Sequence, residues 1–298
     1  MSLIDELQGV VTRIAGDVGA SVVGIGNRWV QGSGVVIAPG LILTNAHNIR
    51  SDETTVTFND GSTGTGTPRG VDADGDLAVL EVDTGEAPAV NWGSGEAAAS
   101  IGTPVFGLSN PGGRGLRVTF GLVSGTERTF RGPRGRRITG TLEHTAPLLP
   151  GSSGGPVVDR DGRLVGINTN RLGEGFYLAI PAGEDLQRRT DLLGRGEAPT
   201  RPHLGVGLAP AHVARGLRKA VGLPETDGLL VRMVEDGGPA ARAGLQEGDL
   251  IVAAGGTELD SVDRLHDILD NATDRLELSL VRGTEERSVT IELSESDA

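Results

Sequence analysis

The sequence predicts a mainly β protein whose last third forms a smaller unit of mixed helices and strands. Glycine accounts for 48 of the 298 residues, roughly 16 % where about 7 % is usual, and it follows no three-residue period. This abundance favours many tight turns over a helical bundle or a collagen-like chain. Between residues 21 and 181, short runs of β-branched and aliphatic residues alternate with Gly, Pro, Asn and Asp, which is the pattern of an antiparallel barrel or sandwich.

The elements follow in order along the chain. Residues 2–15 predict an amphipathic helix, with Ser2 and Asp5 as an N-cap pair. The β-rich region then contains seven expected strands, at residues 21–26, 34–37, 41–44, 54–58, 77–82, 104–108 and 116–120. A helix is expected at 184–193, before a polar stretch with two prolines at 194–202. Further on we expect strands at 204–208, 228–234, 275–282 and 287–293, and helices at 239–243 and 261–269.

This order divides the chain into four parts. They are an N-terminal helical segment (1–20), a β-rich domain (21–193), a linker (194–201) and a mixed α+β domain (202–294). A length of 298 residues agrees with about two domains, since roughly 150 residues per domain is common.

Composition excludes several classes of function. The 27 basic and 40 acidic residues give a net charge of −13, and such a surface repels nucleic-acid phosphates and anionic lipid. The absence of cysteine excludes disulfides, thiolate zinc sites and cysteine nucleophiles. No run approaches the roughly 20 apolar residues that span a bilayer, and the N-terminus has no secretory signal pattern. We therefore expect no nucleic-acid partner, no membrane span, no metal or other cofactor, and a cytoplasmic location as the chain stands, or an extracytoplasmic one if a leader has been lost.

The stretch Pro150-Gly-Ser-Ser-Gly-Gly-Pro156 contains the candidate nucleophile, Ser153. A nucleophilic serine needs a turn that holds its hydroxyl outward while nearby backbone N–H groups point at one spot. Small flanking residues permit that geometry. Taken alone, however, a Gly/Ser run more often forms an ordinary turn between strands.

Two further residues are candidates because of their surroundings. His47 closely follows an expected apolar strand, and Asp76 immediately precedes another. Each also has an ordinary interpretation, His47 as one of five scattered histidines and Asp76 as a turn acid beside Asp72 and Asp74. A calcium loop over these acids is disfavoured, because Leu77 stands where its sharp turn needs glycine.

The three candidates occur in the order His47, Asp76, Ser153, with separations of 29 and 77 residues. Matching motifs lie around them in the same order: Gly32-Ser-Gly-Val-Val-Ile, Leu43-Thr-Asn-Ala-His47, Asp76-Leu-Ala-Val-Leu, Gly107-Leu-Ser-Asn-Pro, Gly151-Ser-Ser-Gly-Gly-Pro, Val165-Gly-Ile-Asn-Thr and Leu178-Ala-Ile-Pro181. On these residues the chain resembles the HtrA (Deg) family of trypsin-like serine proteases that carry PDZ domains. The resemblance implies a trypsin-like protease domain of two six-stranded β-barrels, followed by an α+β PDZ domain.

The resemblance also implies catalytic roles. Ser153 would attack the scissile carbonyl, His47 would take and return the proton, and Asp76 would orient the imidazole. The backbone N–H groups of Gly151 and Ser153, with Ser152 between them, would form the oxyanion hole. Losing Ser153 or His47 would then remove nearly all activity.

By the same resemblance, the specificity pocket falls on Leu148, Asn168 and Asn170. Leu148 suggests an apolar pocket that takes small aliphatic side chains. The chain departs from residues common in the family in the loop before the nucleophile, at Thr145, Leu149 and Ser152.

The end of the chain, 201–293, resembles the family's PDZ domain. The loop whose backbone N–H groups would bind a peptide's C-terminal carboxylate matches His203, Leu204, Gly205 and Val206. Residues 237–252 carry the most recognisable stretch of that domain. Leu265 and Ile268, on the expected helix beyond it, are candidates for the peptide's side-chain pocket or ordinary core residues.

A basic segment stands out against the acidic chain. Residues 114–137 contain a single acid, Glu127, and seven arginines: Arg114, Arg117, Arg128, Arg131, Arg134, Arg136 and Arg137. Its ordinary interpretation is a solvated hairpin. By resemblance, residues 128–138 fall on the family's regulatory loop. We hypothesise that this loop contacts the more acidic second domain, with 10 basic and 18 acidic residues in 201–298, or a neighbouring subunit.

The leading interpretation is a serine endopeptidase that cleaves unfolded or signal-bearing proteins and is regulated by peptide C-termini at the PDZ domain. The alternatives are a catalytically silent PDZ scaffold or chaperone, and a small-ester hydrolase, which the PDZ domain disfavours. The expected partners are protein or peptide substrates. The family commonly forms trimers through its N-terminal region, often by aromatic contacts. Because the first aromatic residue here is Trp29, a homotrimer is left open.

Overall fold

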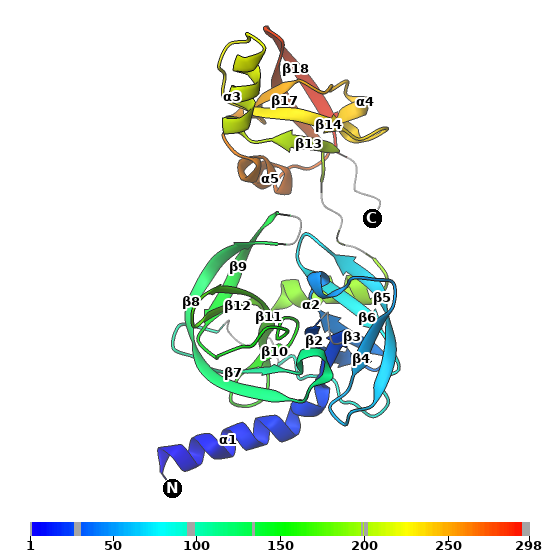
Figure 1. The fold of residues 1–298 in the computed structure, drawn as a ribbon, viewed down its shortest axis with the longest axis vertical. Coiled ribbons are helices and arrows are strands. Elements are labelled where there is room, and N and C mark those ends of the chain that lie inside the picture. The colour runs from blue at the N-terminus through cyan, green and yellow to red at the C-terminus, as the bar shows by residue number, and fades with distance from the viewer. Residues whose placement is uncertain are drawn as a thin grey trace. The chain divides into compact units, whose positions relative to one another are not determined.

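A computed structural model describes residues 2–26, 31–93, 99–132, 135–197, 199 and 202–293. The chain divides into two compact units, Met1–Pro199 and Thr200–Ala298, which are shown in Figure 1. Trp29, Arg134 and three residues of the expected linker lie outside the described residues. Each unit is described by itself below.

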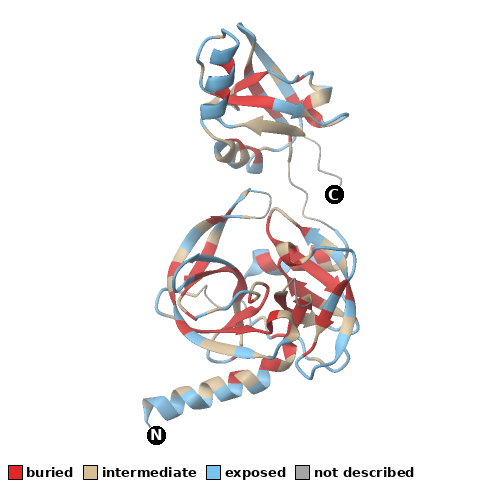
Figure 2. Ribbon diagram, in the orientation of Figure 1, coloured by how far each residue is buried: buried red, intermediate tan, exposed pale blue. Residues whose placement is uncertain are grey.

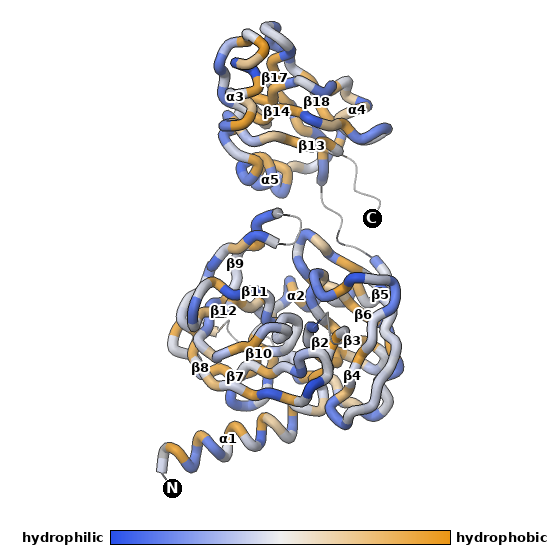
Figure 3. The backbone as a smooth tube through the Cα atoms, viewed as in Figure 1, coloured by the Kyte–Doolittle hydropathy of each residue, from blue (hydrophilic) through white to orange (hydrophobic). Residues whose placement is uncertain are grey.

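The N-terminal helix α1 (Leu3–Asp17) begins at the expected cap. Ser2 Oγ accepts a hydrogen bond from the Asp5 N–H at 3.2 Å, and the Asp5 carboxylate accepts one from the Ser2 N–H at 2.8 Å. Burial increases toward the end of the helix, where Ile14 is 1 % exposed, while Ile4 near its start is 69 % exposed (Figure 2). Apolar and polar residues alternate along α1 (Figure 3), as the amphipathic pattern predicts.

The first barrel closes in the strand order β1-β2-β3-β6-β5-β4. Its strands are β1 (Val22–Gly26), β2 (Gln31–Ala38), β3 (Leu41–Thr44), β4 (Thr54–Thr57), β5 (Thr63–Asp72) and β6 (Leu77–Glu81). Inward-facing aliphatic residues of these strands form one buried cluster, which includes Val23, Ile25, Val36, Ile42, Val56 and Leu80. Closure leaves this sheet without an exposed edge.

The second barrel closes in the order β10-β11-β12-β9-β8-β7. Its strands are β7 (Pro104–Ser109), β8 (Arg117–Arg131), β9 (Arg137–His144), β10 (Pro156–Val158), β11 (Leu164–Gly173) and β12 (Phe176–Pro181). The predicted pair of six-stranded barrels is therefore confirmed. Strands β5, β9, β10, β11 and β12 were not among the strands expected from local pattern, and β8 continues well beyond its expected end.

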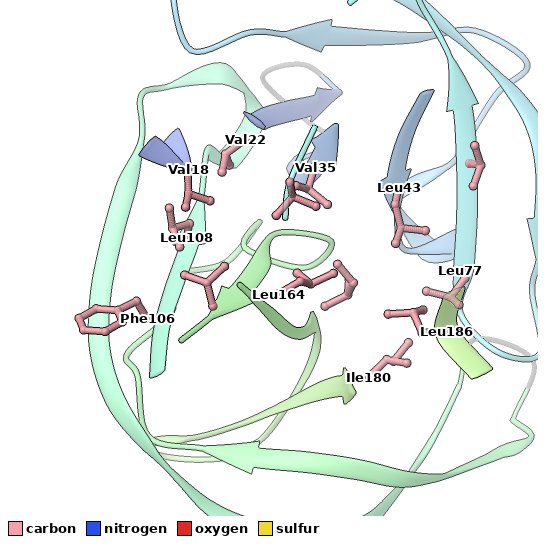
Figure 4. Close-up of a cluster of buried hydrophobic side chains, with 14 of the residues drawn as sticks. Val18, Val22, Val35, Leu43, Leu77, Phe106, Leu108, Leu164, Ile180 and Leu186 are labelled. Atoms are coloured by element: carbon pink, nitrogen blue, oxygen red, sulfur yellow. The ribbon is translucent and has the colours of Figure 1, made fainter. Parts of the chain in front are cut away.

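The largest core cluster joins the two barrels (Figure 4). It combines Val22, Val35, Leu43 and Leu77 of the first barrel with Phe106, Leu108, Leu164 and Ile180 of the second. Helix α2 (Glu184–Gly194) adds Leu186 to this cluster and contacts β5 and β6. An added Cβ at Gly70 would lie 2.5 Å from the Leu193 carbonyl oxygen, so glycine there lets α2 pack closely on β5. This shared core holds the two barrels together, and with them the loops that lie between the barrels.

The described residues of the second unit form a six-stranded sheet and three helices. Strands β13 (Val206–Ala209), β14 (Leu229–Val234), β15 (Leu250–Ala254), β17 (Arg275–Arg282) and β18 (Glu285–Glu292) follow in that order, and β16 (Thr257–Glu258) pairs with β15. The helices are α3 (Ala211–Ala220), α4 (Pro239–Arg242) and α5 (Val262–Asp270). Helix α3 was not expected, because it begins after Pro210 and contains Gly216. Within the described residues, no helix has the length and apolar character needed to cross a membrane.

Candidate active site

The three candidate catalytic residues come from loops on both barrels. His47 lies in the 3₁₀ turn η2 (Ala46–Asn48) after β3, and Asp76 lies in the turn between β5 and β6. Ser153 comes from the loop between β9 and β10. All three line one cavity of about 460 Å³. The structure thus brings together residues that are far apart in the sequence.

His47 and Asp76 form the tight pair that a general base requires. His47 Nδ1 lies 2.9 Å from both carboxylate oxygens of Asp76, and the His47 backbone N–H also donates to Asp76 Oδ1 at 3.1 Å. Asp76 is 1 % exposed, and its remaining acceptor capacity is used by Thr169 Oγ1, which donates to Oδ2 at 2.6 Å. A buried carboxylate with these partners fixes the imidazole with Nδ1 protonated, leaving Nε2 to accept a proton.

Ser153 is held in a resting orientation. Its Oγ donates a 2.8 Å hydrogen bond to the Thr169 carbonyl oxygen. Attack on a substrate requires this hydroxyl to turn toward His47 Nε2, which takes its proton. Thr169 therefore contacts two members of the site, Asp76 through its side chain and Ser153 through its carbonyl.

The nucleophile loop is tied to the first barrel by polar contacts. The Ser153 carbonyl oxygen accepts from the Ser33 N–H and from Asn48 Nδ2, each at 2.9 Å. Ser33 Oγ donates to the Gly151 carbonyl oxygen at 2.9 Å. An added Cβ at Gly154, where φ is +87°, would lie 2.1 Å from the Ser33 carbonyl oxygen. Glycine is therefore required where the two barrels meet.

The backbone of residues 151–153 is the expected oxyanion hole. Gly151 has a φ of +88°, and the Ser152 N–H closes the turn by donating to the Leu149 carbonyl oxygen at 3.1 Å. Within the described part of the chain, the N–H groups of Gly151 and Ser153 have no protein acceptor. Ser152 was also expected in the oxyanion hole. Its N–H instead donates within the turn, and its buried Oγ donates to Ser109 Oγ at 3.1 Å. It shapes the loop and is no third donor.

Asn168 and His144 support the nucleophile loop through hydrogen bonds. The Asn168 backbone N–H and side-chain Nδ2 donate to the Gly155 carbonyl oxygen at 2.9 and 3.0 Å, and its Oδ1 lies 2.9 Å from His144 Nε2. His144 also stacks on Tyr177, with ring centroids 5.9 Å apart. Burial lowers the pKa of His144 to about 4, against a smaller opposing effect of the Asn168 hydrogen bond. His144 is therefore neutral at pH 7.

The cavity is partly apolar beside the nucleophile. Leu148 and Asn170, two of the expected specificity residues, line it together with Phe130, Leu149 and Tyr177. Asn168 also borders it, although its side chain is committed to Gly155 and His144. Phe130 and Tyr177 were not selected from the sequence. They lie on strands β8 and β12, and local pattern did not show which of their side chains point toward the cavity.

Most of the basic segment lies in the β8–β9 hairpin, and among its described arginines Arg128 and Arg136 lie near acids of the same unit. Arg128 Nε lies 3.2 Å from Glu143 Oε2, and Arg136 Nη1 lies 4.0 Å from Asp74 Oδ2. Asp74 belongs to the turn that carries Asp76. Across the described residues, no group of three or more His, Asp or Glu side chains is placed to hold a metal ion.

In the second unit, the expected carboxylate-binding loop precedes the edge strand β13. Gly205 has a φ of +71°, and its carbonyl oxygen accepts from the Glu235 N–H at 2.9 Å, while the Leu204 carbonyl oxygen accepts from the Ala240 N–H at 2.9 Å. Val206 begins β13, which pairs only with β14 among the described strands. His203 Nε2 lies 3.8 Å from Glu235 Oε2.

The two expected pocket residues of α5 differ in burial. Leu265 is 2 % exposed and belongs to the core of the second unit. Ile268 is half-buried and lines a cavity with Thr257, Arg264 and Leu276. Both side chains pack in the same core cluster, and their role in a peptide pocket stays a prediction.

Comparison with known proteins agrees with this geometry. The family model described as trypsin-like peptidase domain matches residues 32–167, and that of the PDZ domain matches residues 230–282. A Synechocystis protein named as the serine protease HhoA is 33 % identical over 282 residues, which cover 89 % of this chain and 71 % of that protein. The serine protease Do-like HtrA of Bacillus subtilis is 30 % identical over 289 residues, which cover 90 % of this chain and 64 % of that protein.

A solved structure shows the same likeness over both units. The HtrA-type protease AlgW with a decapeptide matches with a TM-score of 0.68 and 25 % identity. The match covers 97 % of this chain and 99 % of that one.

Proposed function

The chain belongs to the HtrA (Deg) family of trypsin-like serine proteases with a PDZ domain, and from this we propose that it cleaves unfolded or signal-bearing proteins and is regulated by peptide C-termini bound at its PDZ domain. The observation that supports cleavage best is the site geometry. His47 is held 2.9 Å from buried Asp76, beside a serine whose loop has two N–H groups with no acceptor among the described residues.

The proposed reaction follows from these contacts. Ser153 Oγ turns from the Thr169 carbonyl and attacks the scissile carbonyl carbon while His47 Nε2 takes its proton. The N–H groups of Gly151 and Ser153 stabilise the oxyanion, and Asp76 stabilises the imidazolium. His47 then gives its proton to the leaving amine as the carbon–nitrogen bond breaks. A water molecule, deprotonated by His47, hydrolyses the acyl-enzyme and restores Ser153.

Casein cleavage tests the proposal, because casein is an unfolded protein substrate. We expect Ser153→Ala and His47→Ala each to lower cleavage by at least about 10²–10⁴-fold, the usual contribution of general base catalysis, while circular dichroism shows an unchanged fold. Full cleavage by Ser153→Ala would contradict the assignment. A wild-type chain that binds casein without cleaving it would support the catalytically silent scaffold instead.

Peptide capture at the second unit is supported by the loop at Gly205 and by the edge of β13 that no other described strand pairs, since a peptide can add to a sheet edge while backbone N–H groups bind its carboxylate. We expect a fluorescent peptide with an apolar C-terminal residue to bind the full chain and its C-terminally amidated form to bind at least about tenfold more weakly, as loss of a charged hydrogen-bond acceptor implies. Equal anisotropy titrations for the two peptides would exclude carboxylate capture.

A further inference from the structure

The turn that carries Asp76 has an unfavourable backbone conformation. Asp76 has a φ of +54°, in the left-handed region that residues other than glycine seldom adopt. Such a conformation persists only where the surroundings impose it. The contacts that impose it therefore also set where the Asp76 carboxylate lies relative to His47.

Arg189, on helix α2, supplies part of these contacts from a distant part of the chain. Its Nη2 donates to Asp72 Oδ2 at 2.8 Å and to the Gly75 carbonyl oxygen at 3.0 Å. Asp72 Oδ1 in turn accepts from the Gly75 N–H at 2.8 Å. Both polar groups of the Gly75 backbone are thus bound by one ion pair, and Gly75 directly precedes Asp76.

The fit around this ion pair is close. Asp72 is 3 % exposed and Arg189 is 9 % exposed. An added Cβ at Gly75 would lie 1.9 Å from Arg189 Nη2, so only glycine leaves room for the guanidinium. Asp185 lies 3.5 Å from Arg189 Nη1, and elsewhere in the turn Asp74 lies 4.0 Å from Arg136.

The arrangement favours positioning over stability as the role of the pair. A buried ion pair often stabilises a fold no better than apolar side chains of the same size. Here, moreover, Arg189 Nε is buried without an acceptor among the described residues, although every buried donor left unpaired is costly. The bonds that are formed converge on the backbone beside Asp76.

We propose that Arg189 is a positioning residue for catalysis: through Asp72 and Gly75 it fixes the turn in which Asp76 presents both carboxylate oxygens to His47. The inference rests on the proposed function. It adds a contribution from α2, the last helix before the second unit, to a site otherwise built from the barrel loops.

The test measures the second-order rate at which a fluorophosphonate labels Ser153 in the full chain, across about pH 5 to 9. The variants are Arg189→Met, which keeps volume without charge, and Arg189→Lys, which keeps the charge. Arg188→Gln is the matched control, because Arg188 is the exposed neighbour on the same helix and pairs with Asp185. Circular dichroism establishes a temperature at which every variant is folded.

We expect Arg189→Met to be labelled roughly 10- to 100-fold more slowly, as for other misplaced catalytic groups. The acid limb of its pH–rate profile should move to lower pH, because a displaced Asp76 stabilises the protonated imidazole less. Arg189→Lys should recover part of the rate, and Arg188→Gln should stay within about twofold of wild type.

A folded Arg189→Met variant with a wild-type rate and acid limb would overturn the inference, even if its melting temperature were lower. If that variant does not fold, Arg189→Lys decides the question in the same way, by a slower rate and a shifted acid limb or by neither. Failure of the wild-type chain to be labelled would instead refute the proposed function on which the inference rests.

Discussion

His144 is a buried titratable residue that is linked to the nucleophile loop through Asn168. It is 1 % exposed, its Nε2 lies 2.9 Å from Asn168 Oδ1, and its Nδ1 has no partner among the described residues. Burial lowers its pKa from 6.5 to about 4. A proton on Nδ1 would place an unpaired charge in the core, so acid should destabilise the folded first unit at this point.

The sign and size of the effect follow from the two pKa values. Between pH 4 and 6.5 the unfolded chain binds a proton at His144 that the folded chain does not bind, so the free energy of unfolding rises with pH through this window. The contribution is complete above pH 6.5 and is lost as the pH falls toward 4. At about 1.4 kcal/mol per pKa unit, the whole change is about 3 kcal/mol.

The assay is urea unfolding followed by tryptophan fluorescence, which reports on the first unit because both tryptophans, Trp29 and Trp92, belong to it. We expect His144→Gln, whose amide can still donate to Asn168, to lose about 3 kcal/mol of the pH dependence between pH 4 and 7. His212→Gln, at an exposed position, controls for removal of one histidine. If wild type and His144→Gln showed the same pH dependence, the assignment of this buried group would be refuted.

Two further substitutions test the contacts around the nucleophile. Thr169→Val removes the hydroxyl that donates to Asp76 Oδ2; a hydrogen bond to a charged group contributes about 1.5–3 kcal/mol, so fluorophosphonate labelling should slow by roughly tenfold or more, and an unchanged rate would contradict this role. Gly154→Ala places a Cβ 2.1 Å from the Ser33 carbonyl oxygen and should cost more than about 2 kcal/mol in urea unfolding. Gly61→Ala is its control, with the same φ of +87° but no atom within 4 Å; equal losses in the two variants would refute the steric explanation.

Local pattern made three residues candidates for catalysis, and the family resemblance then suggested their roles. Ser153 lies in a run of small residues, His47 follows an apolar strand and Asp76 precedes one, so each has a signal in its immediate neighbours. Strand β5 was missed because its alternating Gly and Thr, with one Pro, are typical of turns. Of its glycines, Gly70 is explained by the close packing of α2, whereas Gly64 and Gly66 lie against side chains of the first barrel.

The supporting contacts have no such signal. Thr169 contacts Asp76 across 93 residues, Asn48 contacts the Ser153 carbonyl across 105, and Arg189 contacts Asp72 across 117. Nothing next to these residues in the chain marks their partners, because the contacts exist only after both barrels have closed. The resting orientation of Ser153 likewise depends on the Thr169 carbonyl, which folding brings to it.

Mass spectrometry of the fluorophosphonate-treated chain tests the central claim most directly. We predict one adduct, on Ser153, formed rapidly in wild type and lost in His47→Ala, because only the serine beside a general base is nucleophilic at neutral pH. The neighbouring Ser152, buried and bonded to Ser109, should stay unmodified. An untouched Ser153, or labelling that does not depend on His47, would contradict the account.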